Sequence, residues 1–170
     1  NKFLPFYEFH SSSTALCTSL LRKLGITHVV NAAHGKDKSF SLVNTSAEFY
    51  KSSGIKFHGI EALDLSIFPI YPHFNDAAEF IHEALINNGK VLVHCGEGIS
   101  RSATIVLAYL MIKRNFTAQQ ACEHVRCHRA IIPNSGFLKQ LCHLNDQLNE
   151  SRNTRKSQSN HNSQRITVIS

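Results

Sequence analysis

The chain has 170 residues, a length that fits one domain with a substantial core and is too short for two. Hydrophobic residues make up 42% and charged residues 18%, which excludes a wholly disordered chain. The net charge is +6, but residues 151–170 hold four of the 18 basic side chains and no acidic one. The remaining 14 basic side chains face 12 acidic ones, so the body lacks the basic surface of a nucleic-acid-binding protein.

The cysteines indicate a reducing environment. There are five, at irregular spacing and without a CxxC pair, which argues against a disulfide framework or a zinc ribbon. The N-terminal residues lack the pattern of a secretory signal, and no apolar run reaches the ~18 residues of a membrane span. We therefore expect a cytoplasmic or nuclear location. The cysteines are Cys17, Cys95, Cys122, Cys127 and Cys142.

Predicted helices and strands alternate along the chain. A leucine-rich helix ending at Gly25 precedes a buried strand over 26–32, and a second strand lies near 55–60. A helix runs from Pro72 to 87–89, and the all-apolar residues 91–93 are typical of a strand buried on both faces. The pattern predicts an α/β fold with helices flanking a central, mainly parallel sheet.

The C-terminal half is predicted to be helical. Residues 103–112 are apolar almost all round, which indicates a central helix. Thr117 and Gln120 form a capping box for a helix reaching about Arg129, and an apolar stripe over 137–148 marks the last helix. We expect an atypical N-terminal segment at 1–19, because residues 1–15 show no first-strand pattern. A folded domain at 20–149 and a disordered basic tail at 150–170 follow.

The most informative segment is 91–102, VLVHCGEGISRS. Cys95 opens a loop in which Gly96 and Gly98 permit turns that aim backbone N–H groups at one point. The loop runs into the N-terminus of the buried helix, whose dipole favours an anion there. Arg101 can bind two oxygens of a phosphoryl group with its planar guanidinium. The predicted phosphate-binding residues are Gly96, Glu97, Gly98, Ile99, Ser100 and Arg101.

Cys95 is the predicted nucleophile of this loop. The convergent N–H dipoles and the guanidinium favour its thiolate, which could attack phosphorus directly. A Cys-x5-Arg spacing alone is weak, but here it follows an apolar strand, contains two glycines and precedes a buried helix. The alternative is a buried cysteine beside a structural arginine.

Cleavage of a poor leaving group also needs a proton donor, for which we select Asp64. It follows the second strand in a mobile-looking segment, on a loop separate from Cys95. Asp76 and Asp37 have simpler explanations, since Asp76 complements a helix dipole and Asp37 lies in a lysine-rich loop.

Two further side chains flank the loop. Ser102 is placed either to hydrogen-bond the sulfur as it leaves the phospho-enzyme or only to cap the helix, and the sequence leaves both open. His94 is expected to support the loop rather than to act as a base, because neighbouring side chains on a strand point in opposite directions.

Two other chemistries fit less well. His124, Cys127 and His128 share a helix face like half a zinc site, but no second liganding pair is evident. A cysteine protease would need a neutral oxyanion hole rather than an arginine in the loop. We therefore predict no metal and no cofactor.

Four stretches carry a resemblance to a known family: LRKLGITHVVNAA, VNTSAEFYKSSGI, HCGEGISRS and PNSGFLKQLCHLND. From about Leu20 to Leu148 the chain resembles the atypical dual-specificity protein phosphatases, VHR type, of the cysteine-based protein tyrosine phosphatase superfamily. The resemblance implies the protein tyrosine phosphatase-like fold of this family and a two-step mechanism without metal. In it Cys95 is the nucleophile, Arg101 binds phosphate, Asp64 is general acid and then base, and Ser102 assists breakdown of the intermediate.

The resemblance also implies substrates. These are phosphotyrosine and phosphoserine or phosphothreonine in proteins, often in mitogen-activated protein kinases. Gly96 departs from VHR-type loops, which can carry a basic residue there, and Glu97 disfavours polyanionic phosphoinositides. The alternatives are a non-catalytic phosphoprotein-binding module and a lipid or RNA 5′-phosphatase on the same scaffold.

Overall fold

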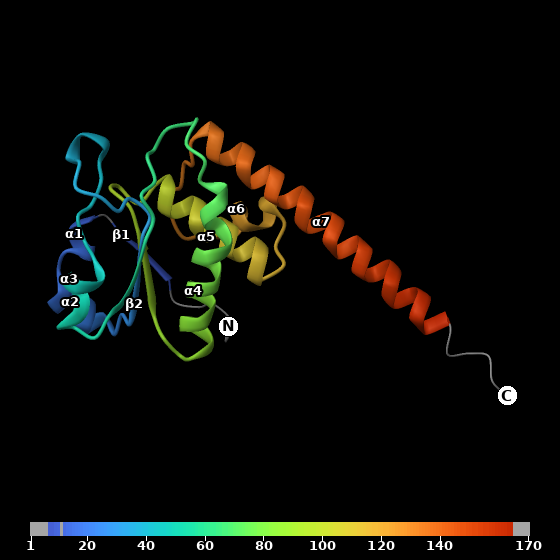
Figure 1. The fold of residues 1–170 in the computed structure, drawn as a ribbon, viewed down its shortest axis with the longest axis horizontal. Helices are drawn as coiled ribbons and strands as arrows, with labels where there is room; N and C mark the ends of the chain where they lie inside the picture. Colours follow the sequence, from blue (N-terminus) through green and yellow to red (C-terminus); the bar gives the residue numbers. More distant parts are fainter. Residues whose placement is uncertain (1–6, 11, 165–170) are drawn as a thin grey trace.

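The computed structural model describes residues 7–10 and 12–164, with side chains over 12–155. Its centre is a four-stranded sheet in the order β1-β4-β2-β3, in which every pairing is parallel (Figure 1). The predicted α/β fold with a mainly parallel sheet is confirmed. The strands are β1 (Tyr7–His10), β2 (His28–Asn31), β3 (Lys56–Gly59) and β4 (Val91–His94).

Successive side chains along a strand point to opposite faces of the sheet and belong to two separate hydrophobic clusters. Val29 and Leu92 belong to a small cluster with Leu21 and Tyr50, under the helices of the N-terminal third. Val30 and its neighbours belong to a larger cluster under the C-terminal helices. The sheet is therefore covered on both faces, with α1–α3 on one side and α4–α6 on the other (Figure 1). Those helices are α1 (Ser12–Ala15), α2 (Thr18–Leu24), α3 (Ala47–Lys51), α4 (Phe74–Ile86), α5 (Arg101–Lys113) and α6 (Ala118–Arg126).

Helix α5 is the centre of the larger core, as its apolar sequence predicts. Residues 101–111 are all buried. It packs against α4, α6, β4 and the last helix, α7 (Ser135–Gln164). The predicted capping box at the start of α6 is confirmed, since the Thr117 hydroxyl accepts from the Gln120 amide and the Gln120 side chain accepts from the Thr117 amide. No helix in the described part of the chain is both long and apolar enough to span a membrane.

The N-terminal segment differs from the expectation. Residues 7–10 form β1, which pairs in parallel with β4 from Tyr7–Val91 to His10–His94. A strand of four residues at a sheet edge is held by main-chain hydrogen bonds, so its side-chain pattern is too short to reveal it. The amide of Ser12 then donates to the carbonyl of Gly96, 3.0 Å away, so this segment also contacts the loop that follows β4.

The C-terminal segment differs as well. A disordered tail is expected over 150–170, but α7 (Ser135–Gln164) continues as far as Gln164. The Arg152 guanidinium donates to the carbonyl of Met111, 2.9 Å away, in the last turn of α5. This contact adds a cation at a helix C-terminus, and helix extension beyond an anchored turn is cooperative. Residues 165–170 of the predicted tail lie outside the described residues.

Candidate active site

The carboxyl ends of β2, β3 and β4 meet at one edge of the sheet, and the candidate site lies there. Asn31 of β2 pairs with both Gly59 of β3 and His94 of β4. The loops that follow these three strands therefore start side by side. They are 32–46, 60–70 and 95–100, the last of which leads into α5.

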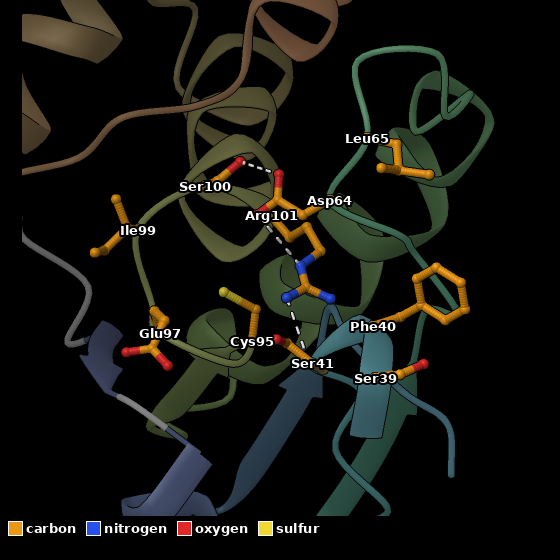
Figure 2. Close-up of a pocket in the computed structure, with 10 residues that line it drawn as sticks. All are labelled: Ser39, Phe40, Ser41, Asp64, Leu65, Cys95, Glu97, Ile99, Ser100 and Arg101. Atoms are coloured by element: carbon orange, nitrogen blue, oxygen red, sulfur yellow. Dashed lines mark hydrogen bonds and ion pairs between the residues drawn. The ribbon is translucent and has the colours of Figure 1, made fainter. Parts of the chain in front are cut away.

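Cys95 lies at the floor of the loop between β4 and α5 and is 1% exposed. The amide of Gly98, a residue with φ of +75°, donates to Cys95 Sγ at 3.2 Å. Ser102 Oγ lies 3.3 Å from the same sulfur. Figure 2 shows the loop curling around the thiol. Donors aimed at the sulfur stabilise negative charge on it, which is the state a nucleophile requires.

Ser102 does not cap the helix. Residue 101 is the first residue of α5 and Ser100 stands at the N-cap. Of the two roles that the sequence leaves open for Ser102, the contact with Cys95 Sγ favours the one directed at the sulfur.

Arg101 is held from two sides. It is 3% exposed, Nη1 donates to the carbonyl of Ala62 at 3.1 Å, and Nη2 donates to the carbonyl of Ser41 at 3.3 Å. Its Nε makes no hydrogen bond to a described residue and lies 3.6 Å from Asp64 Oδ2. The guanidinium is thereby fixed above the loop of Cys95, with N–H groups left for an anion (Figure 2).

Asp64 lies on the loop after β3, opposite Cys95. The Ser100 hydroxyl donates to Asp64 Oδ1 at 2.7 Å, and the Asp64 side chain is 35% exposed. The other two candidates for the general acid, Asp37 and Asp76, each lie at the start of a helix and stabilise it. Asp37 caps a short 3-10 helix, η1 (Lys38–Phe40), where the hydrogen bonds from Ser39 lower its pKa. Asp76 lies in the first turn of α4.

These groups surround a cavity of about 410 Å³. It combines a polar floor with three half-exposed apolar side chains at its mouth, Phe40, Leu65 and Ile99. A pocket of this size holds one phosphorylated side chain and is open to solvent for the rest of a larger molecule. The lining residues are Ser39, Phe40, Ser41, Asp64, Leu65, Cys95, Glu97, Ile99, Ser100 and Arg101 (Figure 2).

Sequence reasoning missed the segment Ser39–Ser41, which forms one wall of the cavity. Its lysine-rich sequence suggests only a solvated loop. The signal that could have revealed it is topological, because loops after parallel strands gather at the same sheet edge. The Asn31 amide fixes this loop by donating to the carbonyl of Val43 and to Thr45 Oγ1.

The loop of Ser41 approaches residue 96 closely. A Cβ at Gly96 would lie 3.2 Å from the carbonyl oxygen of Ser41 and 3.3 Å from Arg101 Nη2. Ser41 itself has a φ of +52°, in the left-handed region that residues other than glycine rarely adopt. The missing side chain at Gly96 lets the two loops approach and lets Arg101 reach Ser41.

Replacing Gly96 by valine is therefore expected to weaken phosphate binding. The new side chain displaces Ser41 or the Arg101 guanidinium, at a cost on the scale of one charge-assisted hydrogen bond, or on the order of tenfold in affinity. Competitive inhibition of aryl phosphate hydrolysis by inorganic phosphate measures this effect. An unchanged inhibition constant in a folded variant would show that the two loops do not constrain each other.

His94 supports the loop from below. It is fully buried, and its Nδ1 lies 3.3 Å from the carbonyl oxygen of Cys95. Burial lowers the pKa of His94 to about 4, so the ring is neutral at neutral pH. The lowered pKa makes folding stability depend on pH. In the unfolded chain the His94 ring binds a proton below its ordinary pKa of about 6.5. In the folded chain it binds a proton only below about pH 4.

The contribution of His94 to the free energy of unfolding should therefore be fully present above pH 6.5. It should fall by roughly 2–3 kcal/mol as the pH drops towards 4. We expect His94→Asn to remove this part of the decline. Chemical denaturation of both proteins at pH 7.5 and pH 4.5 gives the comparison. Burial also lowers the pKa values of the half-buried His28 and His58. These residues are present in the wild type and in the variant, so their contributions cancel in the comparison. Equal losses on acidification would contradict the assignment.

The three side chains that resemble half a zinc site lie at the C-terminal end of α6 and just beyond it. The rings of His124 and His128 lie 5.4 Å apart, and His128 Nδ1 lies 2.9 Å from the carbonyl oxygen of His124. Cys127 is exposed beside them. Over residues 12–155 no group of three or more His, Cys, Asp or Glu side chains is arranged to hold a metal ion.

A buried cysteine in a glycine-containing loop, an arginine at the start of the next helix and an aspartate on a facing loop define a cysteine-dependent phosphatase type of site. The comparison with family models agrees, since the model described as "Dual specificity phosphatase, catalytic domain" matches residues 9–147. The chain belongs to this family.

Its relatives include Dual specificity protein phosphatase 26 of Rattus norvegicus. It is 49% identical over 131 residues, which are 76% of this chain and 59% of the relative. The Mus musculus protein of the same name is 48% identical over the same shares of both chains. The chain thus spans 59% of the length of these curated relatives.

Solved structures show the same fold. DUSP15 is 31% identical with a TM-score of 0.67, and the match covers 88% of this chain and 94% of DUSP15. A human tyrosine phosphatase-like serine/threonine/tyrosine-interacting protein is 30% identical with a TM-score of 0.69, covering 81% of this chain and 89% of its own. Human DUSP28 has a TM-score of 0.74 at 23% identity, covering 87% of this chain and 96% of its own, and shows the fold alone.

Proposed function

We propose that this chain is a protein phosphatase that hydrolyses phosphotyrosine and phosphoserine or phosphothreonine through a cysteinyl-phosphate, without a metal ion. The observation that carries the proposal is the environment of Cys95. Its buried sulfur accepts a hydrogen bond from the Gly98 amide and contacts the Ser102 hydroxyl, at the floor of a cavity that Arg101 also lines. Family membership over residues 9–147 supports it.

In the first step the phosphoryl oxygens bind the loop N–H groups and the Arg101 guanidinium. Cys95 Sγ attacks phosphorus, the phosphorus–oxygen bond breaks, and Asp64 gives its proton to the leaving oxygen. In the second step the Asp64 carboxylate takes a proton from water as that water attacks phosphorus. The phosphorus–sulfur bond breaks, and the Ser102 hydroxyl hydrogen-bonds the sulfur as it leaves.

The mouth of the cavity favours a protein substrate over a phosphoinositide or an RNA 5′ end. Phe40, Leu65 and Ile99 surround it, each between 40% and 48% exposed, and Glu97 adds a carboxylate on the loop itself. Apolar side chains suit the residues around a phosphorylated tyrosine or threonine. A carboxylate opposes the additional phosphates of a polyanion.

A non-catalytic phosphoprotein-binding module is the second candidate. One structure similar to this chain is of a protein whose name describes a phosphatase-like interacting protein. Here, however, nucleophile, phosphate ligand and proton donor lie around one cavity, which favours turnover.

Family resemblance leads us to propose mitogen-activated protein kinases among the substrates. For location we propose the cytoplasm or the nucleus, where the five cysteines, all free thiols in the structure, would stay reduced.

The test is hydrolysis of p-nitrophenyl phosphate and of phosphotyrosine and phosphothreonine peptides in EDTA near pH 6. We expect turnover of all three substrates, with phosphoinositides turned over more slowly than the peptides. Binding of phosphopeptides without release of phosphate would support the binding module instead. Faster turnover of phosphoinositides would support the lipid phosphatase.

A further inference from the structure

Asn134 joins the phosphate-binding loop, the loop of Asp64 and helix α7. Its Nδ2 donates to Asp64 Oδ1 at 2.9 Å, and its backbone amide donates to Ser100 Oγ at 3.3 Å. The Ser100 hydroxyl in turn donates to Asp64 Oδ1. Two donors from two different segments thus converge on one carboxylate oxygen.

The two Asp64 oxygens are therefore unequal. Oδ1 receives both hydrogen bonds, whereas Oδ2 receives none from a described residue and lies 3.6 Å from Arg101 Nε, on the side of the phosphate ligand. An oxygen that already accepts two donors is a poor place for a proton, so a protonated Asp64 carries its proton on Oδ2. That oxygen faces the guanidinium which binds the phosphoryl group.

The side chain at position 134 has a second contact that makes an amide necessary. Asn134 Oδ1 accepts from the Phe137 amide at 2.9 Å, which is an N-cap of α7. Oδ1 must accept and Nδ2 must donate, so the orientation of the amide is fixed by its partners. Serine would keep the cap but lose the donor to Asp64, and aspartate would keep the cap but place a second carboxylate beside it.

We propose that Asn134 is a positioning residue for the proton donor: together with Ser100 it anchors Asp64 through Oδ1 and directs Oδ2 towards the leaving oxygen. This inference rests on the proposed phosphatase function and goes beyond it. Within the described residues the Asn134 side chain hydrogen-bonds Asp64 and the Phe137 amide but neither Cys95 nor Arg101, so its effect should appear only where proton donation limits the rate.

The test uses Asn134→Ser and substrates of different leaving groups. p-Nitrophenolate leaves without much protonation, whereas phenolate and the threonine alkoxide need a proton. We expect kcat/KM of Asn134→Ser to fall roughly 10- to 100-fold for phenyl phosphate and a phosphothreonine peptide, and to change little for p-nitrophenyl phosphate. Asn134→Asp should show the same selectivity with a larger loss.

Gln140 supplies a matched control on the same helix. It links α7 to the far end of the Asp64 loop and to the residue that follows it, because its amide donates to the carbonyl of Phe68 and its oxygen accepts from the Tyr71 amide. Its hydrogen bonds within the described part of the chain go to Phe68, Tyr71 and Gly136, and none goes to Asp64. Gln140→Ala should therefore leave the ratio of the two kinds of substrate unchanged, even if thermal unfolding shows both variants to be less stable.

Combination with Asp64→Asn completes the test. If Asn134 acts through Asp64, the double variant should lose no more phenyl phosphate activity than Asp64→Asn alone. Equal losses on both kinds of substrate in a folded Asn134→Ser protein, or additive losses in the double variant, would overturn the positioning role while leaving the phosphatase function intact. A wild-type protein that turns over none of the substrates would overturn both.

Discussion

Replacing Cys95 by serine is expected to abolish phosphate release, with a loss of at least about 10⁴-fold in kcat. The hydroxyl has almost the same shape, so the Gly98 amide and Ser102 still surround it. It is not ionised near neutral pH, however, and the described partners of the Cys95 side chain, the Gly98 amide and the Ser102 hydroxyl, are not bases that could activate it. The assay is hydrolysis of p-nitrophenyl phosphate in EDTA.

The Cys95→Ser variant should still bind phosphopeptides. Arg101 and the loop amides are untouched, so a phosphotyrosine peptide is expected to bind Cys95→Ser as well as, or better than, it binds the wild type. Calorimetry or fluorescence polarisation measures this. Activity that persists in Cys95→Ser would exclude the cysteinyl-phosphate route, and lost binding together with lost activity would point to a disrupted loop rather than a missing nucleophile.

Replacing Asp64 by asparagine should have the second-largest effect. An amide can occupy the place of the carboxylate beside Ser100 but cannot give or take the proton, so kcat should fall about 10²- to 10⁴-fold for phenyl phosphate. The loss should be smaller for p-nitrophenyl phosphate, whose leaving group needs little protonation.

The pH profile gives the more specific result. We expect kcat/KM of the wild type to rise and then fall with pH, and the fall on the basic side to be absent in Asp64→Asn, because that fall reports loss of the proton from the general acid. A basic limb that persists in the variant would assign the proton donor to another group. Asp76→Asn, in the first turn of α4, is the control and should keep the wild-type profile.

The parts of the fold that the sequence predicts are those set by local patterns. The all-apolar run of β4, the all-round apolar sequence of α5 and the capping box of α6 each carry their own signal and appear where expected. Strand β1 carries no such signal, because its place depends on main-chain pairing with β4. The extension of α7 past residue 150 depends on the contact of Arg152 with α5, a tertiary effect that composition does not contain.

The candidate site divides in the same way. The loop of Cys95 and Arg101 is contiguous in sequence, so its spacing can be read, and the structure brings Asp64 and Ser102 to it. Ser41 and Asn134 come from loops 60 and 33 residues away from Arg101 and contact the site through a carbonyl and a side-chain amide. Their sequence neighbourhoods suggest a solvated loop and a helix start, and only the meeting of loops at one sheet edge gives them a role.

The most direct test of the account is to trap the covalent intermediate. Acid quenching of Ser102→Ala during turnover of p-nitrophenyl phosphate, followed by proteolysis and mass spectrometry, should find phosphate on the peptide that contains Cys95. The amount should exceed that in the wild type, because the departing sulfur lacks its hydroxyl partner. A burst of p-nitrophenol equal to the enzyme concentration should accompany it. Turnover without a phosphorylated Cys95 in either protein, or with phosphate on another residue, would contradict the central claim that this thiol is the nucleophile.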